Sequence, residues 1–176
     1  MISLARRRLS DDHRTVNQVL QQLVTALHNN DVTASYSKLD LLWARLAVHI
    51  RAEHLHLFPA VLNQLAGTET KSMIENLRAD HDFFMHELAR AVGILRNLPG
   101  AIDDQEIEAR LASVLAVVLE VEKRLAHHNT MEENHIYRLA STILTEEEQI
   151  GLATRVNTEL ENRPSRFSEA AWANAQ

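Results

Sequence analysis

Histidine and glutamate stand four residues apart at two places in the chain. His49 precedes Glu53, and His128 precedes Glu132. Residues four apart lie on one face of an α-helix, so each pair would present an imidazole and a carboxylate side by side. Imidazole nitrogen and carboxylate oxygen suit iron, zinc or manganese. The two pairs therefore predict a metal site.

A lone histidine precedes each pair, as Asp12-His13 before the first and Asp80-His81 before the second. Because the same residue types recur in the same order, we interpret the chain as a duplicated helical hairpin. Two half-sites that face each other would be suited to hold two metal ions bridged by two carboxylates. The predicted metal ligands are His13, His49, Glu53, His81, His128 and Glu132.

The composition limits the chemistry that these residues can support. The chain has 176 residues with ten His and no Cys, which excludes thiolate-bound zinc, iron–sulfur clusters and disulfides. Its net charge of -6 argues against a nucleic-acid partner. No stretch approaches the roughly 20 apolar residues of a membrane span, and the basic start of the chain lacks the apolar core of a secretory signal. We therefore expect a cytoplasmic protein with no membrane partner.

The elements that would position the ligands are long helices. Four Gly and three Pro are too few for a many-turned β protein. Apolar residues spaced three and four apart predict helices over residues 10–29 and 32–65. A third helix, with Thr68 as its N-cap, stops by Pro99-Gly100, and a fourth follows a capping box formed by Asp103 and Glu106.

The predicted fold is all-α, an up-down-up-down four-helix bundle with a short C-terminal fifth helix and tail. The fifth helix would begin at a capping box of Thr145 and Glu148 and end before Pro164. We expect an N-terminal tail over residues 1–9, the bundle over 10–142, and the short helix and C-terminal tail over 143–176. In that tail Phe167 and Trp172 would be free to dock.

Each apolar stripe of the bundle leads to a predicted ligand, which places the ligands in the interior. Two glutamates buried there require positive charge, because an unpaired buried carboxylate costs several kcal/mol. Chain lengths to the turns bring His13, His49 and His81 to one level. The fourth helix fits less well, because it is several residues too long between its start and His128.

This pattern resembles the hemerythrin-like, or HHE cation-binding, family over roughly residues 10 to 140. That family supplies His from its first helix, HxxxE from its second, one or two His from its third, and His with a carboxylate from its fourth. Leu57-Phe58-Pro59 is also similar to the family's usual continuation. The resemblance implies two iron ions with an oxo or hydroxo bridge. Zinc and manganese are the alternatives, and a structural zinc pair in a regulator is a third reading.

The chain departs from the dioxygen-carrying members, which carry HxxxH on the third helix. Here the second position is Met85, and His86 lies one residue further, about 100° around the helix. A site of four His and two Glu leaves more coordination positions open, which favours reaction over stable carriage. The iron–sulfur repair branch has a similar ligand set but carries an N-terminal cysteine motif that this chain lacks.

We therefore expect a non-haem di-iron protein that binds or reduces dioxygen, peroxide or nitric oxide in defence, sensing or iron handling. The alternative is a non-catalytic regulatory module that responds to iron or oxygen. No catalytic side chain is predicted, and both enzymatic activity and a homodimer are left open.

The remaining polar and aromatic residues near the stripes have two readings each. His56 and His135 continue the stripes, so they would join the ligands, orient the glutamates or lie at the edge of the core. They also create ExxH motifs typical of ferritin-like proteins, whose further glutamates this chain lacks. Asp12 and Asp80 are expected to be solvated or to cap helices, with bonding to a neighbouring imidazole as the alternative. The solvated histidines would be His28, His54, His86 and His127, and the pocket-lining or core-packing residues would be Phe58, Phe84, Met85 and Tyr137.

Overall fold

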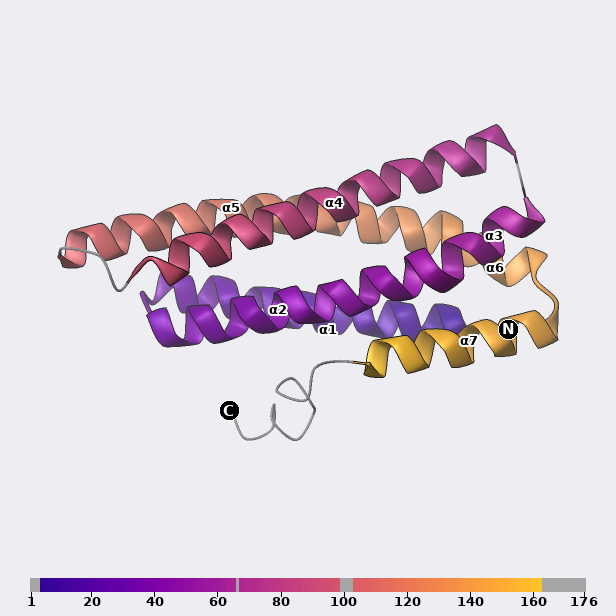
Figure 1. Ribbon diagram of the computed structural model, residues 1–176, viewed down its shortest axis with the longest axis horizontal. Coiled ribbons are helices and arrows are strands. Elements are labelled where there is room, and N and C mark those ends of the chain that lie inside the picture. The colour runs from indigo at the N-terminus through magenta and orange to yellow at the C-terminus, as the bar shows by residue number, and fades with distance from the viewer. Residues whose placement is uncertain (1–3, 66, 99–102, 163–176) are drawn as a thin grey trace.

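The computed structural model describes residues 4–65, 67–98 and 103–162, and the regular structure in these ranges is helical throughout. Four long helical segments run antiparallel as a bundle (Figure 1). In chain order they are α1 (Leu4–His28); α2 (Val32–Ala52) continued by the π-helical turn η1 (Glu53–Leu57) and α3 (Phe58–Gln64); α4 (Thr68–Arg96); and α5 (Asp104–Met131) continued by the π-helical turn η3 (Glu132–Ile136) and α6 (Tyr137–Ile143). The shorter α7 (Glu146–Glu161) follows, so the predicted bundle with a fifth helix is confirmed.

Local sequence signals account for the starts of α5 and α7. The Asp103 side chain accepts a hydrogen bond from the Glu106 amide at the start of α5. Thr145 and Glu148 form the complete capping box at the start of α7. The prediction for α4 was wrong by one residue, because Gly67 occupies the cap position and Thr68 is already helical. The predicted C-terminal tail, with Phe167 and Trp172, lies outside the described residues.

Helix α1 begins at Leu4, so residues 4–9 belong to the first helix and the predicted N-terminal tail was wrong there. Ala5 and Leu9 extend the apolar stripe of α1 towards its N-terminus, and both are buried. They pack in one cluster with Leu57 and Val156. The helix is therefore long enough to cover the end of the bundle beyond His13.

Replacing Leu9 by alanine tests this extension. Because the Leu9 side chain is fully buried, we expect the variant to lose about 2–5 kcal/mol of unfolding free energy. The exposed Arg8→Ala variant is the matched control and should stay within about 0.5 kcal/mol of wild type. Urea unfolding followed by circular dichroism measures both. Equal stability of the two variants would mean that residues 4–9 do not pack as described.

The core consists of two apolar clusters on either side of a polar layer. One cluster includes Leu20, Leu42, Leu88 and Val118. The other contains Leu9, Phe58, Ile74, Tyr137 and Leu152. Each long segment passes from one cluster to the other, and at the crossing its inward side chains change from aliphatic residues to histidine and glutamate.

Helix α7 packs against α1 and α2 at the end of the bundle that contains the second cluster (Figure 1). Its buried face is formed by Leu152, Val156 and Leu160. Arg51 of α2 pairs with Glu159 of α7 at the edge of this contact. Among the described residues, no helix is both long and apolar enough to cross a membrane.

Candidate metal centre

The structure brings the six predicted ligands together in the polar layer. None of the six residues is more than 4% exposed. His13 and His49 form one group with the two glutamates, which we term the first half-site. His81 and His128 form the second half-site with the same two glutamates. Within each group the ligand atoms lie within 4.8 Å of one another, so each group is compact enough to hold one metal ion.

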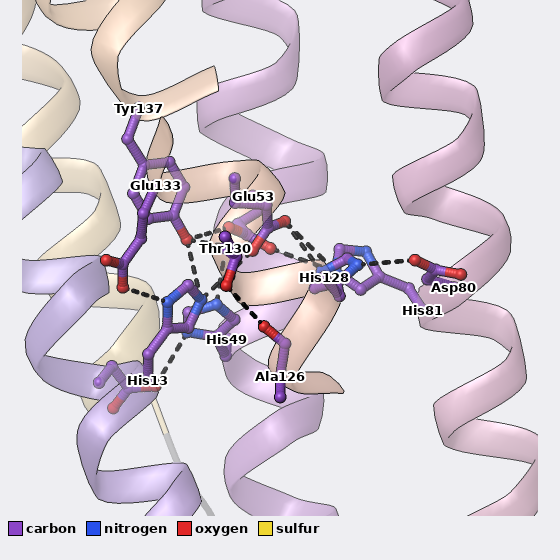
Figure 2. A network of polar contacts seen from close by, with 12 residues as sticks. His13, His49, Glu53, Asp80, His81, Ala126, His128, Thr130, Glu133 and Tyr137 are labelled. Atoms are coloured by element: carbon purple, nitrogen blue, oxygen red, sulfur yellow. Dashed lines mark hydrogen bonds and ion pairs between the residues drawn. The ribbon is translucent and has the colours of Figure 1, made fainter. Parts of the chain in front are cut away.

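Each glutamate presents one oxygen to each half-site. Glu53 Oε1 lies 3.5 Å from His49 Nε2, and its Oε2 lies 3.3 Å from His81 Nε2. Glu132 repeats this arrangement. Its Oε2 lies 3.2 Å from His13 Nε2, and its Oε1 lies 3.1 Å from His128 Nε2. Figure 2 shows Glu53 between the two pairs of histidines. This is the geometry that two bridging carboxylates require.

All four imidazoles direct their Nε2 atoms into the centre and their Nδ1 atoms outward. In the part of the chain that the structure describes, the inward atoms of His49, His81 and His128 are buried without a hydrogen-bond partner, and so are Glu53 Oε2 and Glu132 Oε1. Buried polar atoms without partners are rare in folded proteins, because each one loses its bonds to water. These five atoms converge on one space, and their nitrogen and oxygen types fit the first coordination sphere of a transition metal.

The electrostatics of the centre favour a bound cation. Burial raises the pKa of Glu53, and the negative charge of Glu132 raises it further. Burial also acts to raise the pKa of Glu132, but His128 and His13 outweigh it and hold that pKa well below its usual value. Among the described residues, only histidines and Tyr137 contact the two carboxylates, so no Lys or Arg pairs with them.

Asp12 supports His49 from outside the centre. Its Oδ2 accepts a hydrogen bond from His49 Nδ1 over 3.0 Å, and its Oδ1 accepts one from Arg45 over 2.8 Å. Burial alone would raise the pKa of Asp12, but these two partners lower it from 3.8 to about 2. Since the folded pKa is depressed, the ionised carboxylate stabilises the fold above pH 3.8, and this contribution is lost as the pH falls towards 2.

Asp80 has the same role in the second half-site. Its Oδ2 lies 3.2 Å from His128 Nδ1, and Arg124 donates to its Oδ1 over 2.7 Å. The expectation that Asp12 and Asp80 are solvated or capping was therefore wrong. The alternative was a bond to the neighbouring imidazole; each aspartate does bond to an imidazole, but to one on another helix. Each aspartate points away from the histidine next to it in sequence, so it reaches a histidine on a neighbouring helix.

Neutralising Asp12 tests its support of His49. Hydrogen bonds to the outer nitrogen of a ligating histidine fix its tautomer and raise its basicity. We expect Asp12→Asn to weaken cobalt(II) binding at the first half-site by about 10- to 100-fold, as measured by titration calorimetry. Asp11→Asn is the control, because the Asp11 side chain pairs with Arg14 on the protein surface. Unchanged affinity in Asp12→Asn would refute the role assigned to this carboxylate.

Tyr137 belongs to the centre. The sequence had left two readings of this residue open, pocket lining and core packing. Its hydroxyl donates to Glu53 Oε1 over 2.6 Å and lies 3.1 Å from His13 Nε2 (Figure 2). Burial and the two glutamates raise the pKa of Tyr137 well above its usual value, so the hydroxyl keeps its proton. Phe58 occupies the matching place in the second half-site, where it stacks on His81 with ring centroids 6.1 Å apart. Comparing the two repeats would have singled out this extra hydroxyl.

Two further residues contact the lone histidines from outside. Glu133 Oε1 lies 2.9 Å from His13 Nδ1. His54 Nε2 lies 2.9 Å from His81 Nδ1, so the prediction that His54 is solvated was wrong. Burial is the main cause that lowers the pKa of His54, which favours its neutral form. Each of these residues directly follows one of the two glutamates of the centre, so the two occupy the same position in the two repeats.

The π-helical turns explain why His56 and His135 lie outside the centre. Each turn adds one residue at the glutamate, so Phe58 bonds through its amide to Glu53 O and Tyr137 to Glu132 O, five residues back. The aromatic residues therefore face inward. His56 is half-buried beside Glu159, 3.9 Å away, and His135 is exposed, so the prediction that both face the interior was wrong. The exposed histidines His28, His86 and His127 lie where they were predicted.

Comparison with known proteins assigns the chain to a family. No curated protein matches it. The family model described as the hemerythrin HHE cation binding domain matches residues 4–140. That range contains all six predicted ligands and both π-helical turns, and it ends before α7. The chain therefore belongs to the hemerythrin HHE cation-binding domain family.

Proposed function

We propose that this protein holds two iron ions and uses them to bind or reduce a small ligand, namely dioxygen, peroxide or nitric oxide. The observation that carries the proposal is the pair of glutamates that each present one oxygen to both half-sites. Four imidazoles and two carboxylates form a donor set that suits iron, with zinc or manganese as chemical alternatives. The six predicted residues are proposed as the ligands of these ions.

An incomplete protein ligand set supports reactivity towards an added ligand. Each half-site offers two histidines and two shared glutamates, fewer than the six ligands of an octahedral ion. Met85, one helical turn from His81, supplies no further imidazole and packs against the apolar cluster instead. His86 is exposed. When bound, the iron pair would supply the open coordination positions and the electrons for the reaction.

The residues of the chain would control the surroundings of the bound ligand. Phe58 and Phe84 are fully buried and pack against His81, which excludes water from that side. The Tyr137 hydroxyl oxygen lies 2.6 Å from Glu53 Oε1, so its proton is within reach of the centre. A protonated hydroxyl in a dry pocket can stabilise negative charge that develops on a reduced oxygen ligand.

Peroxide consumption by the iron-loaded protein tests the proposal. We expect oxygen evolution or peroxide loss over many turnovers, followed with an oxygen electrode and by absorbance. The Glu53→Ala, Glu132→Ala double variant, incubated with the same iron and desalted, controls for free iron. Consumption that stops after about one equivalent would instead favour the regulatory module, in which the centre reports iron or oxygen by stabilising the fold. Failure to retain iron would refute the proposed function.

A further inference from the structure

The outer hydrogen bonds of the four histidines make the two half-sites unequal. Within each half-site one histidine bonds through Nδ1 to an aspartate, His49 to Asp12 and His128 to Asp80. An arginine pairs with each aspartate, so the two half-sites have the same outer partners at these two histidines. The difference lies in the partners of the lone histidines.

The lone histidine of the first half-site bonds to a carboxylate and that of the second bonds to an imidazole. Glu133 Oε1 lies 2.9 Å from His13 Nδ1, whereas His54 Nε2 lies 2.9 Å from His81 Nδ1. Glu133 and His54 occupy the same position in the two repeats, directly after the glutamates of the centre. The two Nδ1 contacts therefore have the same length, and the charge of the partner differs.

We propose that the first half-site, with His13 and His49, binds its metal ion more tightly and is filled before the second. Both of its imidazoles bond to carboxylates, whereas only one imidazole of the second half-site does. A carboxylate partner makes an imidazole a stronger donor, and its negative charge attracts the bound cation. Losing such a partner typically costs 10- to 100-fold in metal affinity, which sets the expected difference between the half-sites.

This inference rests on the proposed metal centre but not on its reaction. It assigns Glu133 and His54 as positioning residues that set the order of loading. The quantity that these two residues change is the ratio of metal occupancy between the two half-sites of one molecule. A general loss of folding or of metal affinity would lower both occupancies and would not change their ratio in this way.

Anomalous diffraction from crystals of the protein given one equivalent of cobalt(II) per chain measures that ratio directly. We expect the cobalt occupancy between His13 and His49 to exceed that between His81 and His128 by about tenfold or more. Glu133→Gln keeps the shape of the side chain and removes its charge, so the two occupancies should approach each other. Glu122→Gln is the control, because it makes the same change in net charge about three turns away on α5, where Glu122 contacts Gln21.

Exchanging the two residues is the sharper test. In the double variant Glu133→His, His54→Glu the carboxylate moves to the second half-site, and the order of loading should reverse. In solution, calorimetric titration with cobalt(II) should show two unequal steps for wild type and two nearly equal steps for Glu133→Gln. The titration needs no crystals, so it also tests the order of loading in a variant that does not crystallise.

The outcomes separate this inference from the proposed function. Two cobalt ions per chain with equal occupancy at one equivalent would overturn the loading order and leave the proposed function intact. First filling of the second half-site in wild type would overturn it as well. Absence of metal binding in wild type would overturn both.

Discussion

Wild-type protein loaded with iron is expected to retain about two ions per chain, and the Glu53→Ala, Glu132→Ala variant is expected to retain none. Each glutamate faces both half-sites, so removing both takes away every carboxylate ligand at once. Each ion would then keep only two imidazoles. The loss should therefore exceed that from any single histidine substitution. Elemental analysis after desalting measures the metal content.

The double variant is not expected to unfold, because two buried carboxylates without a cation oppose folding of the metal-free chain. Circular dichroism checks this. A variant with the exposed residues Glu108 and Glu147 replaced by alanine makes the same change in net charge and should still retain two ions. If the Glu53→Ala, Glu132→Ala variant stays folded and still retains two ions, the bridging role of the glutamates is wrong.

Removing the metal from wild type is expected to lower its melting temperature by roughly 15–30 °C. A ligand present at 1,000 times its Kd stabilises the folded state by about 4 kcal/mol, and two such ions would contribute about 8 kcal/mol. For a chain of this size each kcal/mol corresponds to about 2–4 °C. The direction of the effect follows from the position of the centre between two apolar clusters, where metal removal leaves two buried carboxylates facing each other.

Thermal melts with and without a chelator measure this shift. Adding iron(II) back should restore the higher melting temperature. The Glu53→Ala, Glu132→Ala variant should melt at the same temperature under both conditions, because it has no ions to lose. A chelated wild-type protein that is shown to be free of metal and melts at the unchanged temperature would mean that the metal makes no contribution to the fold.

The clustering of the six candidate ligands could be predicted from sequence, because the apolar stripe of each helix fixes the face on which they lie. His49 and Glu53 are one helical turn apart, and the apolar stripes on either side fix the direction in which both point. Counting residues to the turns also predicted the common level of three helices. The mismatch on the fourth arises because α5 extends beyond the end of α4 (Figure 1). The position of a loop in the sequence does not specify how far one helix extends past the end of the other.

The outer residues could not be predicted, because their contacts run between helices. Asp12 bonds to a histidine 37 positions away and Glu133 to one 120 positions away. Such contacts depend on the rotation of each helix about its own axis. A helical pattern fixes that rotation for the buried stripe but does not specify which polar residue at its border meets which neighbour. The contact of His54 with His81 was missed for this reason.

The two π-helical turns impose a rule on any redesign of this bundle. Each divides a long helix into two stretches whose inward faces are out of step by one residue. A single repeating pattern of apolar and polar residues, written straight through, would bury His56 and expose Phe58. An engineer who transplants the centre into an idealised straight bundle must therefore transplant the extra residue with it, and must pattern the stretches before and after it separately.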